Sequence, residues 1–261
     1  MDYGQLIKDI FTLNFSSMGT RWAKLSGRVM RKLHGEKIDE VPVKKIPVII
    51  NNRNRYTYLI KLIEWLEDAG MENIIILDND STYPKLLEYY DITKHRVVRL
   101  GENVGHLALW KSTVYDEFKW QHYIYTDPDV VPVASCPKDM PEYLLKQLKK
   151  YPSIEKIGLG LKIDDLPDHY RNKKEVIEWE KQFWKKIVER GIYDAGVDTT
   201  FALYRPYTNG AKWVAPAYRT DEPYMAHHMP WYENTADPGE ENLYYMKHAR
   251  QGASHWTNKT T

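Results

Sequence analysis

The chain has 261 residues, of which 43% are hydrophobic, and its formal net charge at pH 7 is +1. This length supplies core material for one large α/β domain or two small ones, while a charge near zero argues against a nucleic-acid-binding protein that relies on phosphate contacts. Cys136 is the single cysteine, which excludes an intramolecular disulfide framework and a multi-cysteine zinc site, so we expect a reducing, cytoplasmic environment.

Residues 1–40 form a basic segment that differs from the rest of the chain. Its Lys and Arg residues alternate with Trp22, Leu25, Val29 and Leu33 at helical spacing, which predicts a basic amphipathic helix. Two interpretations stay open, namely a peripheral contact with an anionic membrane surface and an ordinary helix packed on the domain with its basic face in solvent. The segment lacks a signal-peptide layout, and no run of 18 apolar residues predicts a transmembrane helix.

From residue 41 onward, short apolar runs alternate with helical patterns. The expected helices cover residues 59–69, 83–90 and 106–117, and the expected strands are Ile46–Ile50, Ile74–Leu77, Val97–Leu100 and His122–Tyr125. This alternation predicts βαβ units and therefore an α/β fold with a mostly parallel central sheet flanked by helices. Because parallel strands end at one edge of the sheet, the polar loops after these strands are expected to converge where a nucleotide could bind.

Residues 136–261 have a different rhythm. Helices are expected at Met140–Lys149, Val176–Val188 and 239–249, and strands at Ile157–Leu161 and Thr199–Tyr204. No linker-like break separates this part from residues 41–135, so we predict a single domain over residues 41–261.

The most informative stretch is the end of the fourth expected strand, which runs into Asp127-Pro128-Asp129. Two carboxylates at the carboxyl end of a buried strand can share one hard divalent cation, and Pro128 stiffens the turn between them. Such a cation would in turn hold a diphosphate. Many surface turns also contain Asp-x-Asp, so an ordinary turn remains the alternative when this motif is taken alone.

Taken in order, the motifs between about residues 45 and 135 resemble those of GT-A fold glycosyltransferases, most closely the family 2 glycosyltransferases. The matching stretches are Ile49-Ile50-Asn51-Asn52-Arg53, Asp78-Asn79-Asp80-Ser81-Thr82 (with Asp80 where glycine is usual), Asn103-Val104-Gly105 and Asp127-Pro128-Asp129. The resemblance implies a GT-A, Rossmann-like fold. Residues 41–135 would form its nucleotide-binding half, and residues 136–261 would complete the acceptor and metal sites.

The resemblance also implies donor-binding roles. Asn51 and Arg53 would line the base pocket, and Asp78 would bind the base or ribose with help from Asp80. The turn of Asn103 and Gly105 would lie beside the donor. For Asp78 and Asp80 the alternative is capping of the helix at residues 83–90, and for Asn103 and Gly105 it is a plain turn.

The same resemblance implies a metal cofactor. Asp127 and Asp129 would approach the ribose and bind Mn²⁺ or Mg²⁺, which neutralises charge on the leaving nucleoside diphosphate. GT-A enzymes often add a histidine ligand from a C-terminal segment, and the pair His227-His228 is the candidate, with His228 preferred. Neutral imidazole is a good ligand for Mn²⁺. A histidine packed among aromatic residues is the alternative.

An inverting transferase needs a general base, which in family 2 is a carboxylate, usually within a Glu-Asp pair that opens a helix. This sequence departs from that pattern. Its candidates are Asp198, in a polar cluster that enters an apolar strand, and the pair Asp221-Glu222, which Pro223 follows. We prefer Asp198, and a retaining mechanism or a different base stays open.

These observations predict a cytoplasmic, metal-dependent glycosyltransferase, with inversion expected from the family. It would use a nucleotide-sugar donor and a glycan or lipid-linked acceptor, as in surface polysaccharide biosynthesis. One alternative is a nucleotidyltransferase, which normally has a glycine-rich phosphate loop after the first strand, whereas residues 51–55 contain no glycine. The other is a non-catalytic nucleotide- or carbohydrate-binding protein.

Overall fold

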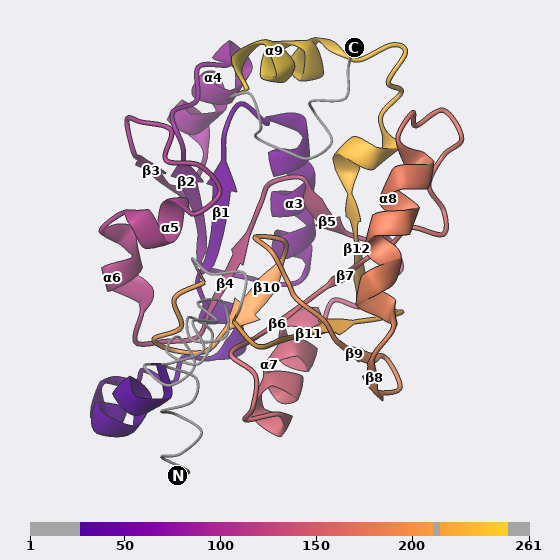
Figure 1. Ribbon diagram of the computed structural model, residues 1–261. Coiled ribbons are helices and arrows are strands. Elements are labelled where there is room, and N and C mark those ends of the chain that lie inside the picture. Colours follow the sequence, from indigo (N-terminus) through magenta and orange to yellow (C-terminus); the bar gives the residue numbers. More distant parts are fainter. Residues whose placement is uncertain (1–26, 211–214, 250–261) are drawn as a thin grey trace, which may run out of the picture.

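The computed structural model of the protein describes residues 27–210 and 215–249, and Figure 1 shows their arrangement. Residues 27–33 are helical. The elements up to residue 126 are η1 (Gly35–Lys37), η2 (Val43–Lys45), β1 (Val48–Asn52), α3 (Thr57–Asp68), β2 (Ile74–Asp78), α4 (Pro84–Ile92), β3 (Arg96–Arg99), α5 (Ala108–Lys111), α6 (Val114–Phe118) and β4 (Tyr123–Thr126). The later elements are β5 (Val130–Pro132), α7 (Met140–Lys150), β6 (Lys156–Gly158), β7 (Gly160–Leu161), α8 (Lys173–Glu180), η3 (Lys181–Trp184), β8 (Ile187–Glu189), β9 (Ile192–Asp194), β10 (Ala202–Tyr204), β11 (Ala217–Thr220), β12 (Met225–His228), η4 (Met229–Tyr232) and α9 (Glu240–His248).

Within the described residues the strands form two sheets. The larger sheet has nine strands in the order β3-β2-β1-β4-β10-β6-β11-β9-β8, and the smaller has three in the order β5-β12-β7. Strands β3, β2, β1 and β4 are parallel neighbours, whereas β10 lies antiparallel between β4 and β6. All strands of the larger sheet except β9 and β10 therefore run in one direction, and the predicted α/β class with a mostly parallel sheet is confirmed.

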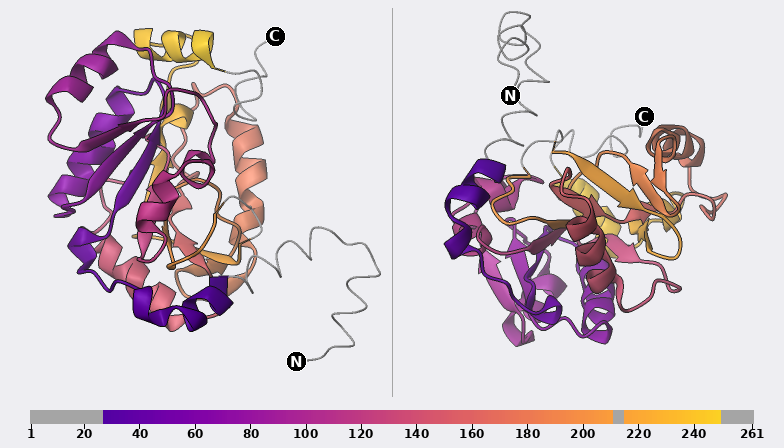
Figure 2. Two further views of the ribbon diagram at one scale, coloured as in Figure 1. Left: turned by 90° about the vertical axis from the view of Figure 1, so that its left-hand side faces the viewer. Right: turned by 90° about the horizontal axis from the view of Figure 1, so that it is seen from below.

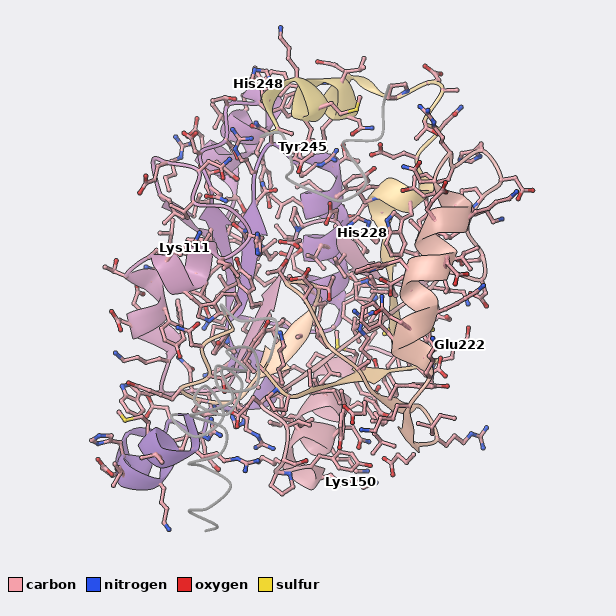
Figure 3. All side chains as sticks on the ribbon, viewed as in Figure 1. Lys111, Lys150, Glu222, His228, Tyr245 and His248 are labelled. Carbon is pink, nitrogen blue, oxygen red and sulfur yellow. The ribbon has the colours of Figure 1, made fainter. Side chains whose placement is uncertain are left out.

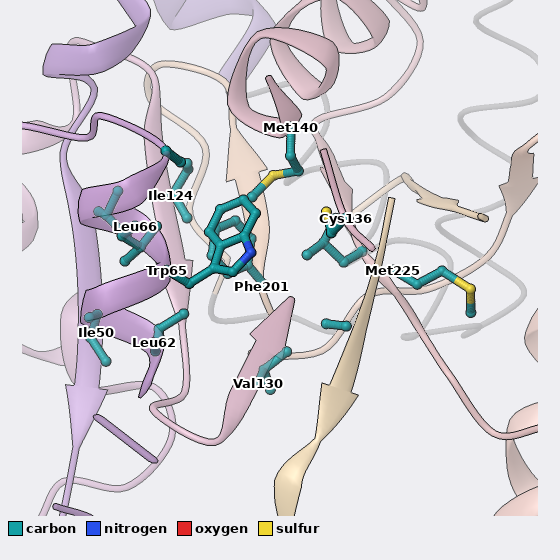
Figure 4. Close-up of a cluster of buried hydrophobic side chains, with 14 of the residues drawn as sticks. Ile50, Leu62, Trp65, Leu66, Ile124, Val130, Cys136, Met140, Phe201 and Met225 are labelled. Atoms are coloured by element: carbon teal, nitrogen blue, oxygen red, sulfur yellow. The ribbon is translucent and has the colours of Figure 1, made fainter. Parts of the chain in front are cut away.

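The two faces of the larger sheet are covered by separate apolar clusters. Successive side chains of a strand point to opposite faces, so Ile50 of β1 packs in one cluster with Trp65 of α3, while Ile49 packs in the other with Tyr123 of β4. Figure 4 shows Trp65 in the first cluster, near Met140 of α7. Helices on both faces fix the sheet and hold its carboxyl edge in place.

The expected strands of the first half are present, with shifted ends. β1 runs two residues further than predicted, because Asn51 and Asn52 still pair with Leu77 and Asp78 of β2. The helix expected over residues 106–117 is wrong as one element, since it is divided into α5 and α6 around Ser112.

The second half departs further from expectation. The predicted helix Val176–Val188 ends at Glu180, and Ile187–Glu189 instead forms the hairpin strand β8 against β9, with Gly191 at φ 81° in the turn. The β-branched Ile187 and Val188 favour a strand over a helix. The strand expected at Ile157–Leu161 is divided between β6 and β7, which belong to different sheets. The final helix, expected at 239–249, is present as α9.

The ends of the described chain lie at opposite ends of the molecule. Figure 2 shows the helical residues 27–33 at one end of the larger sheet and α9 at the other. Residues 1–26 of the predicted basic segment, with Arg21 and Trp22, lie outside the described residues. Among the helices that the structure describes, none combines the length and apolar character needed to span a lipid bilayer.

Candidate active site

Asp127 and Asp129 lie in the turn that joins β4 of the larger sheet to β5 of the smaller one. The hydroxyl of Thr199, just before β10, donates a hydrogen bond to Asp127 Oδ2 at 2.8 Å. The backbone N–H of Met229, just after β12, donates to the carbonyl of Asp129 at 2.8 Å. Both aspartates are thus held by segments that lie far away in the sequence.

The carboxylates of Asp127, Asp129 and Asp198 lie close enough to repel one another. Burial raises the pKa of Asp127 well above its usual range, and the charges of Asp129 and Asp198 raise it further. Hydrogen bonds from Thr199 and Asn51 act in the opposite direction. Among the described residues, no lysine or arginine forms an ion pair with Asp127, Asp129 or Asp198, so a bound cation would relieve the repulsion between these carboxylates.

His228 reaches the same turn from β12, which pairs with β5 so that His228 lies opposite Val130. Its Nε2 atom is 4.0 Å from Asp129 Oδ1. Burial lowers the pKa of His228, and the positive charge of Arg55 lowers it further while Asp129 opposes the shift. The imidazole is therefore neutral near pH 7, the form that binds a metal ion.

His227 points to the other face of β12, because neighbouring residues of a strand alternate. Its Nε2 lies 3.1 Å from Asp165 Oδ2, and its ring centroid lies 4.3 Å from that of Tyr232. The structure therefore brings His228, but not His227, to the two aspartates.

The residues of this turn fit a divalent metal ion in kind and in charge. Within the described residues, no group of three or more His, Cys, Asp or Glu side chains is already gathered around one point. Nevertheless, the separation of 4.0 Å between His228 Nε2 and Asp129 Oδ1 is one that two ligands can span across one ion, with bonds of about 2.0–2.2 Å each. Two mutually repelling carboxylates and a neutral imidazole make Asp127, Asp129 and His228 the metal candidates.

The polar residues after β1 and β2 lie at the same edge of the sheet. Asn51 donates to the carbonyl of Gly105 at 3.5 Å, and its buried Oδ1 atom has no hydrogen-bond partner in the described chain. Asp78 is buried and accepts hydrogen bonds from the hydroxyl of Tyr90 at 3.0 Å and the N–H of Ser81 at 3.3 Å. Asn51 is therefore free to accept a hydrogen bond, whereas Asp78 already holds the turn together.

Asp80 has a backbone conformation that glycine adopts more readily than other residues. Its φ is 67°, in the left-handed region that glycine adopts without steric cost. The capping alternative for Asp78 and Asp80 is not observed, since α4 begins without a side-chain cap. Instead, Asn54 Oδ1 accepts hydrogen bonds from the N–H groups of Thr82 at 2.6 Å and Tyr83 at 2.9 Å.

Asn103 and Gly105 form a turn, and their place beside the donor stays a prediction. Asn103 Oδ1 accepts from the N–H of Gly105 at 3.1 Å, and Gly105 has φ 85°. The Gly105 carbonyl also accepts from Asn79 Nδ2 at 3.0 Å. The turn thereby positions the amide side chains of the neighbouring strands.

Of the candidate bases, Asp198 lies at the site. It is exposed, it precedes the Thr199 that contacts Asp127, and its charge contributes to the raised pKa of Asp127. Asp221 instead accepts from the hydroxyl of Tyr193 at 3.3 Å, and Glu222 pairs with Lys162 at 2.7 Å. Figure 3 shows Glu222 well away from His228.

Sequence reasoning missed a second layer of residues, which α9 brings over the edge of the sheet. The Arg55 guanidinium lies 3.6 Å from the ring centroid of Tyr245, and its Nη1 lies 3.9 Å from Glu233 Oε1. The hydroxyl of Tyr58 donates to Glu233. Burial raises the pKa of Tyr245, and the charges of Asp129 and Asp127 raise it further, although Arg55 opposes them.

The predicted donor residue Arg53 is part of this layer. Its Nη1 donates to the carbonyl of His248 at 2.7 Å, and its buried Nε has no partner in the described chain. Figure 3 shows Tyr245 and His248 on α9, with Tyr245 on the side towards His228. The basic loop after β1 was the one sequence signal for this layer, since Glu233 and Tyr245 belong to no motif.

Comparisons with known proteins give no family assignment. No family model matches the chain, and no curated protein matches it. The resemblance to family 2 glycosyltransferases therefore stays a prediction.

Some solved structures match parts of the chain. A structure of GalNAc-T7 with UDP, GalNAc and Mn²⁺ matches 67% of this chain and 42% of its own, at 14% identity and a TM-score of 0.40. UDP-glucose pyrophosphorylase complexed with UDP-glucose matches 78% of this chain and 99% of its own, at 11% identity and a TM-score of 0.43. HddC from Yersinia pseudotuberculosis, complexed with GMP-PN, matches 46% and 60%, at 17% identity and a TM-score of 0.32. The function is therefore argued from the site itself.

Proposed function

We propose that this chain is a metal-dependent glycosyltransferase that transfers a sugar from a nucleotide-sugar donor to a glycan or lipid-linked acceptor, with inversion, in surface polysaccharide biosynthesis. The observation that carries this proposal is the convergence of Asp127, Asp129, His228 and Asp198 at the carboxyl edge of the sheet, with no lysine or arginine of the described chain paired to the carboxylates. We also propose a cytoplasmic location, since Cys136 is a buried free thiol.

Each residue has a distinct part in this reaction. Asp127, Asp129 and His228 would hold Mn²⁺ or Mg²⁺, which supplies charge neutralisation for the leaving nucleoside diphosphate. Thr199 holds the carboxylate of Asp127 in place through the 2.8 Å hydrogen bond. Asp198, exposed beside this pair, accepts the proton of the acceptor hydroxyl.

The donor nucleoside would lie at the ends of β1 and β2. Asn51 offers a buried amide oxygen that has no partner in the described chain, and Arg53 offers a buried N–H of the same kind. Unpaired buried polar atoms are costly, so a ligand that pairs with both gains binding energy. Asp78 positions the turn after β2, and Asp80, two residues on, is a further candidate for binding the donor.

The test is a thermal-shift screen of nucleoside diphosphates and nucleotide-sugars with and without Mn²⁺. A ligand at about 100 times its Kd stabilises the native state by about 2.7 kcal/mol. We expect one nucleotide to raise the melting temperature in the presence of Mn²⁺. Asp129→Asn should lose this Mn²⁺-dependent shift while its unliganded melting temperature stays unchanged, because the substitution is nearly isosteric. Asp91→Asn, on the exposed end of α4, is the matched control.

The outcomes separate the alternatives. Release of nucleoside diphosphate from a nucleotide-sugar supports the transferase, whereas exchange of pyrophosphate into the nucleotide-sugar identifies a nucleotidyltransferase. Mn²⁺-dependent binding without turnover identifies a binding protein. A normal shift and normal turnover by Asp129→Asn would show that the metal assignment is wrong.

A further inference from the structure

The helical residues 27–33 contact the domain through Arg28 and Arg31, whereas Val29 and Leu33 face solvent. Arg31 pairs with the buried Glu155 at 2.9 Å, and Arg28 donates to the carbonyl of Pro152 at 2.9 Å. Val29 is 42% exposed and Leu33 is 65% exposed. An ordinary surface helix has the opposite arrangement, with apolar residues towards the core. Arg28 and Lys32 also remain exposed, so basic and apolar side chains share the solvent-facing surface of this helix.

A basic cavity lies between this helix and the end of α7. Its volume is about 640 Å³, and it is lined by Arg28, Arg31, Lys32, Pro152, Ser153 and Arg205. Among the described residues, Glu155 is the carboxylate that pairs with these side chains, and Lys32 forms no ion pair. Arg205 is fixed by bonds to the carbonyls of Ile154 at 2.8 Å and Tyr151 at 3.1 Å. The cavity thus carries an excess of positive charge.

The same excess of positive charge affects the pKa of the nearby His122. The pKa of His122 is lowered to about 4, first by burial and then by the positive charges of Arg205, Lys149 and Arg31. The pKa of Arg205 is itself lowered by burial and by Arg31. Positive charges at this end of the molecule therefore repel one another, and a bound anion would stabilise them.

We propose that this face, formed by residues 27–33 and the basic cavity, docks on an anionic membrane surface. A phospholipid phosphate would bind at Arg28, Arg31 and Lys32, while Val29 and Leu33 enter the interface between headgroups and acyl chains. Basic and apolar side chains on one helix are what such a surface binds. A free phosphate would match the charges but would leave Val29 and Leu33 in water, so the exposed apolar pair favours the lipid.

This face is separate from the candidate active site. Lys150, at the end of α7 near the cavity, and His228 lie far apart in Figure 3, and Figure 2 shows the helical residues 27–33 at the opposite end from α9. Docking through this face therefore leaves the donor site away from the bilayer. The proposal does not depend on the proposed function, and either can fail without the other.

The test is co-sedimentation of the full chain with vesicles of phosphatidylcholine alone and with 30% phosphatidylglycerol. We expect binding to the anionic vesicles only, and its loss as the salt concentration rises. The double variant Arg28→Gln/Lys32→Gln should bind roughly thirtyfold more weakly, since each basic side chain near an anionic membrane is worth about a factor of five. Lys174→Gln/Lys185→Gln removes the same charge from another surface and should bind like the unchanged protein.

A second pair of variants tests the apolar part. Val29→Ser/Leu33→Ser keeps every charge and should also weaken binding, while far-ultraviolet circular dichroism and the melting temperature confirm that it folds. The proposal is overturned by equal binding to both vesicles, by equal binding of the two charge variants, or by complete displacement by inorganic phosphate at an ionic strength matched with chloride. Coverage of Val29 and Leu33 by residues 1–26 of this chain would appear as the absence of vesicle binding, which also overturns it.

Discussion

Removing the hydroxyl of Thr199 should shift the pH range in which the donor binds. The Thr199 hydroxyl donates to Asp127 Oδ2 at 2.8 Å and favours the ionised carboxylate, which burial and Asp129 disfavour. A hydrogen bond to a charged group contributes about 1.5–3 kcal/mol, and one pKa unit corresponds to about 1.4 kcal/mol. Thr199→Val should therefore raise the pKa of Asp127 further, because the ionised carboxylate loses about 1.5–3 kcal/mol of stabilisation.

Because a protonated Asp127 cannot bind a metal ion, the acid limb of Mn²⁺-dependent donor binding should move to higher pH. The assay is the Mn²⁺-dependent shift in melting temperature, measured with one nucleotide from pH 5 to 9. The matched control is Thr200→Val, since the Thr200 hydroxyl is buried without a hydrogen-bond partner in the described chain. If the pH profiles of the two variants superimpose, the role given to Thr199 and Asp127 is refuted.

Three further predictions concern catalysis, pH and stability. Asp198→Asn should lower kcat by a factor of roughly 10²–10⁴ while nucleotide binding persists. Glu222 is an exposed partner of Lys162, so the control Glu222→Gln should leave kcat unchanged. Equal effects of the two substitutions on kcat would show that Asp198 is not the base. Burial lowers the pKa of His122 from 6.5 to about 4, so the unfolded chain binds a proton between these values and the folded chain does not. The free energy of unfolding should accordingly fall by about 3 kcal/mol as the pH drops through this window, and urea denaturation of His122→Asn should show a smaller fall. Arg219 and Glu180 form a buried ion pair at 2.9 Å, so Arg219→Met should lower the free energy of unfolding by about 3–5 kcal/mol, because it leaves a lone buried carboxylate. Adding Glu180→Leu should restore part of this free energy in the same urea measurement. An Arg219→Met variant as stable as the unchanged protein contradicts this prediction.

The strands of the first half were predictable because each is a short, nearly continuous apolar run. Ile49, Ile75 and Ile124 are buried residues of neighbouring parallel strands, in a sheet that is covered on both faces. Strands in such a sheet are apolar at nearly every position and do not alternate between apolar and polar residues. Only the residues at which these strands begin and end differ from the prediction. Asn51 and Asn52 remain paired with β2. Hydrophobicity alone does not predict this pairing, because it is made by backbone groups and not by side chains.

The second half was harder to predict because its strands are short and pair with distant partners. β10 has three residues, Ala202–Tyr204, and lies between β4 and β6. β5, with three residues, and β7, with two, pair with β12 in a separate sheet. Runs of two or three residues give no periodic signal in the sequence. Whether they become strands is decided by the distant strands with which they pair.

The choice between His227 and His228 shows the same dependence on pairing. The sequence offers two adjacent histidines of equal chemistry. Once Met225–His228 is a strand, alternation sends them to opposite faces, and the pairing of His228 with Val130 brings it to Asp129. His227 then contacts Asp165. A preference for His228 could be stated from the sequence, but its reason is the register of β12.

The two parts of the candidate site therefore rest on different sheets. Asn51 and Asp127 stand at the carboxyl edge of the larger sheet, whereas Asp129 and His228 lie at the junction with the smaller one, at the end of β12. The turn Asp127-Pro128-Asp129 joins the two sheets. The two carboxylates therefore stand at the two ends of this turn, with Pro128 alone between them. Under the proposed function, the register of β12 with β5 therefore decides whether His228 can share a metal ion with Asp129.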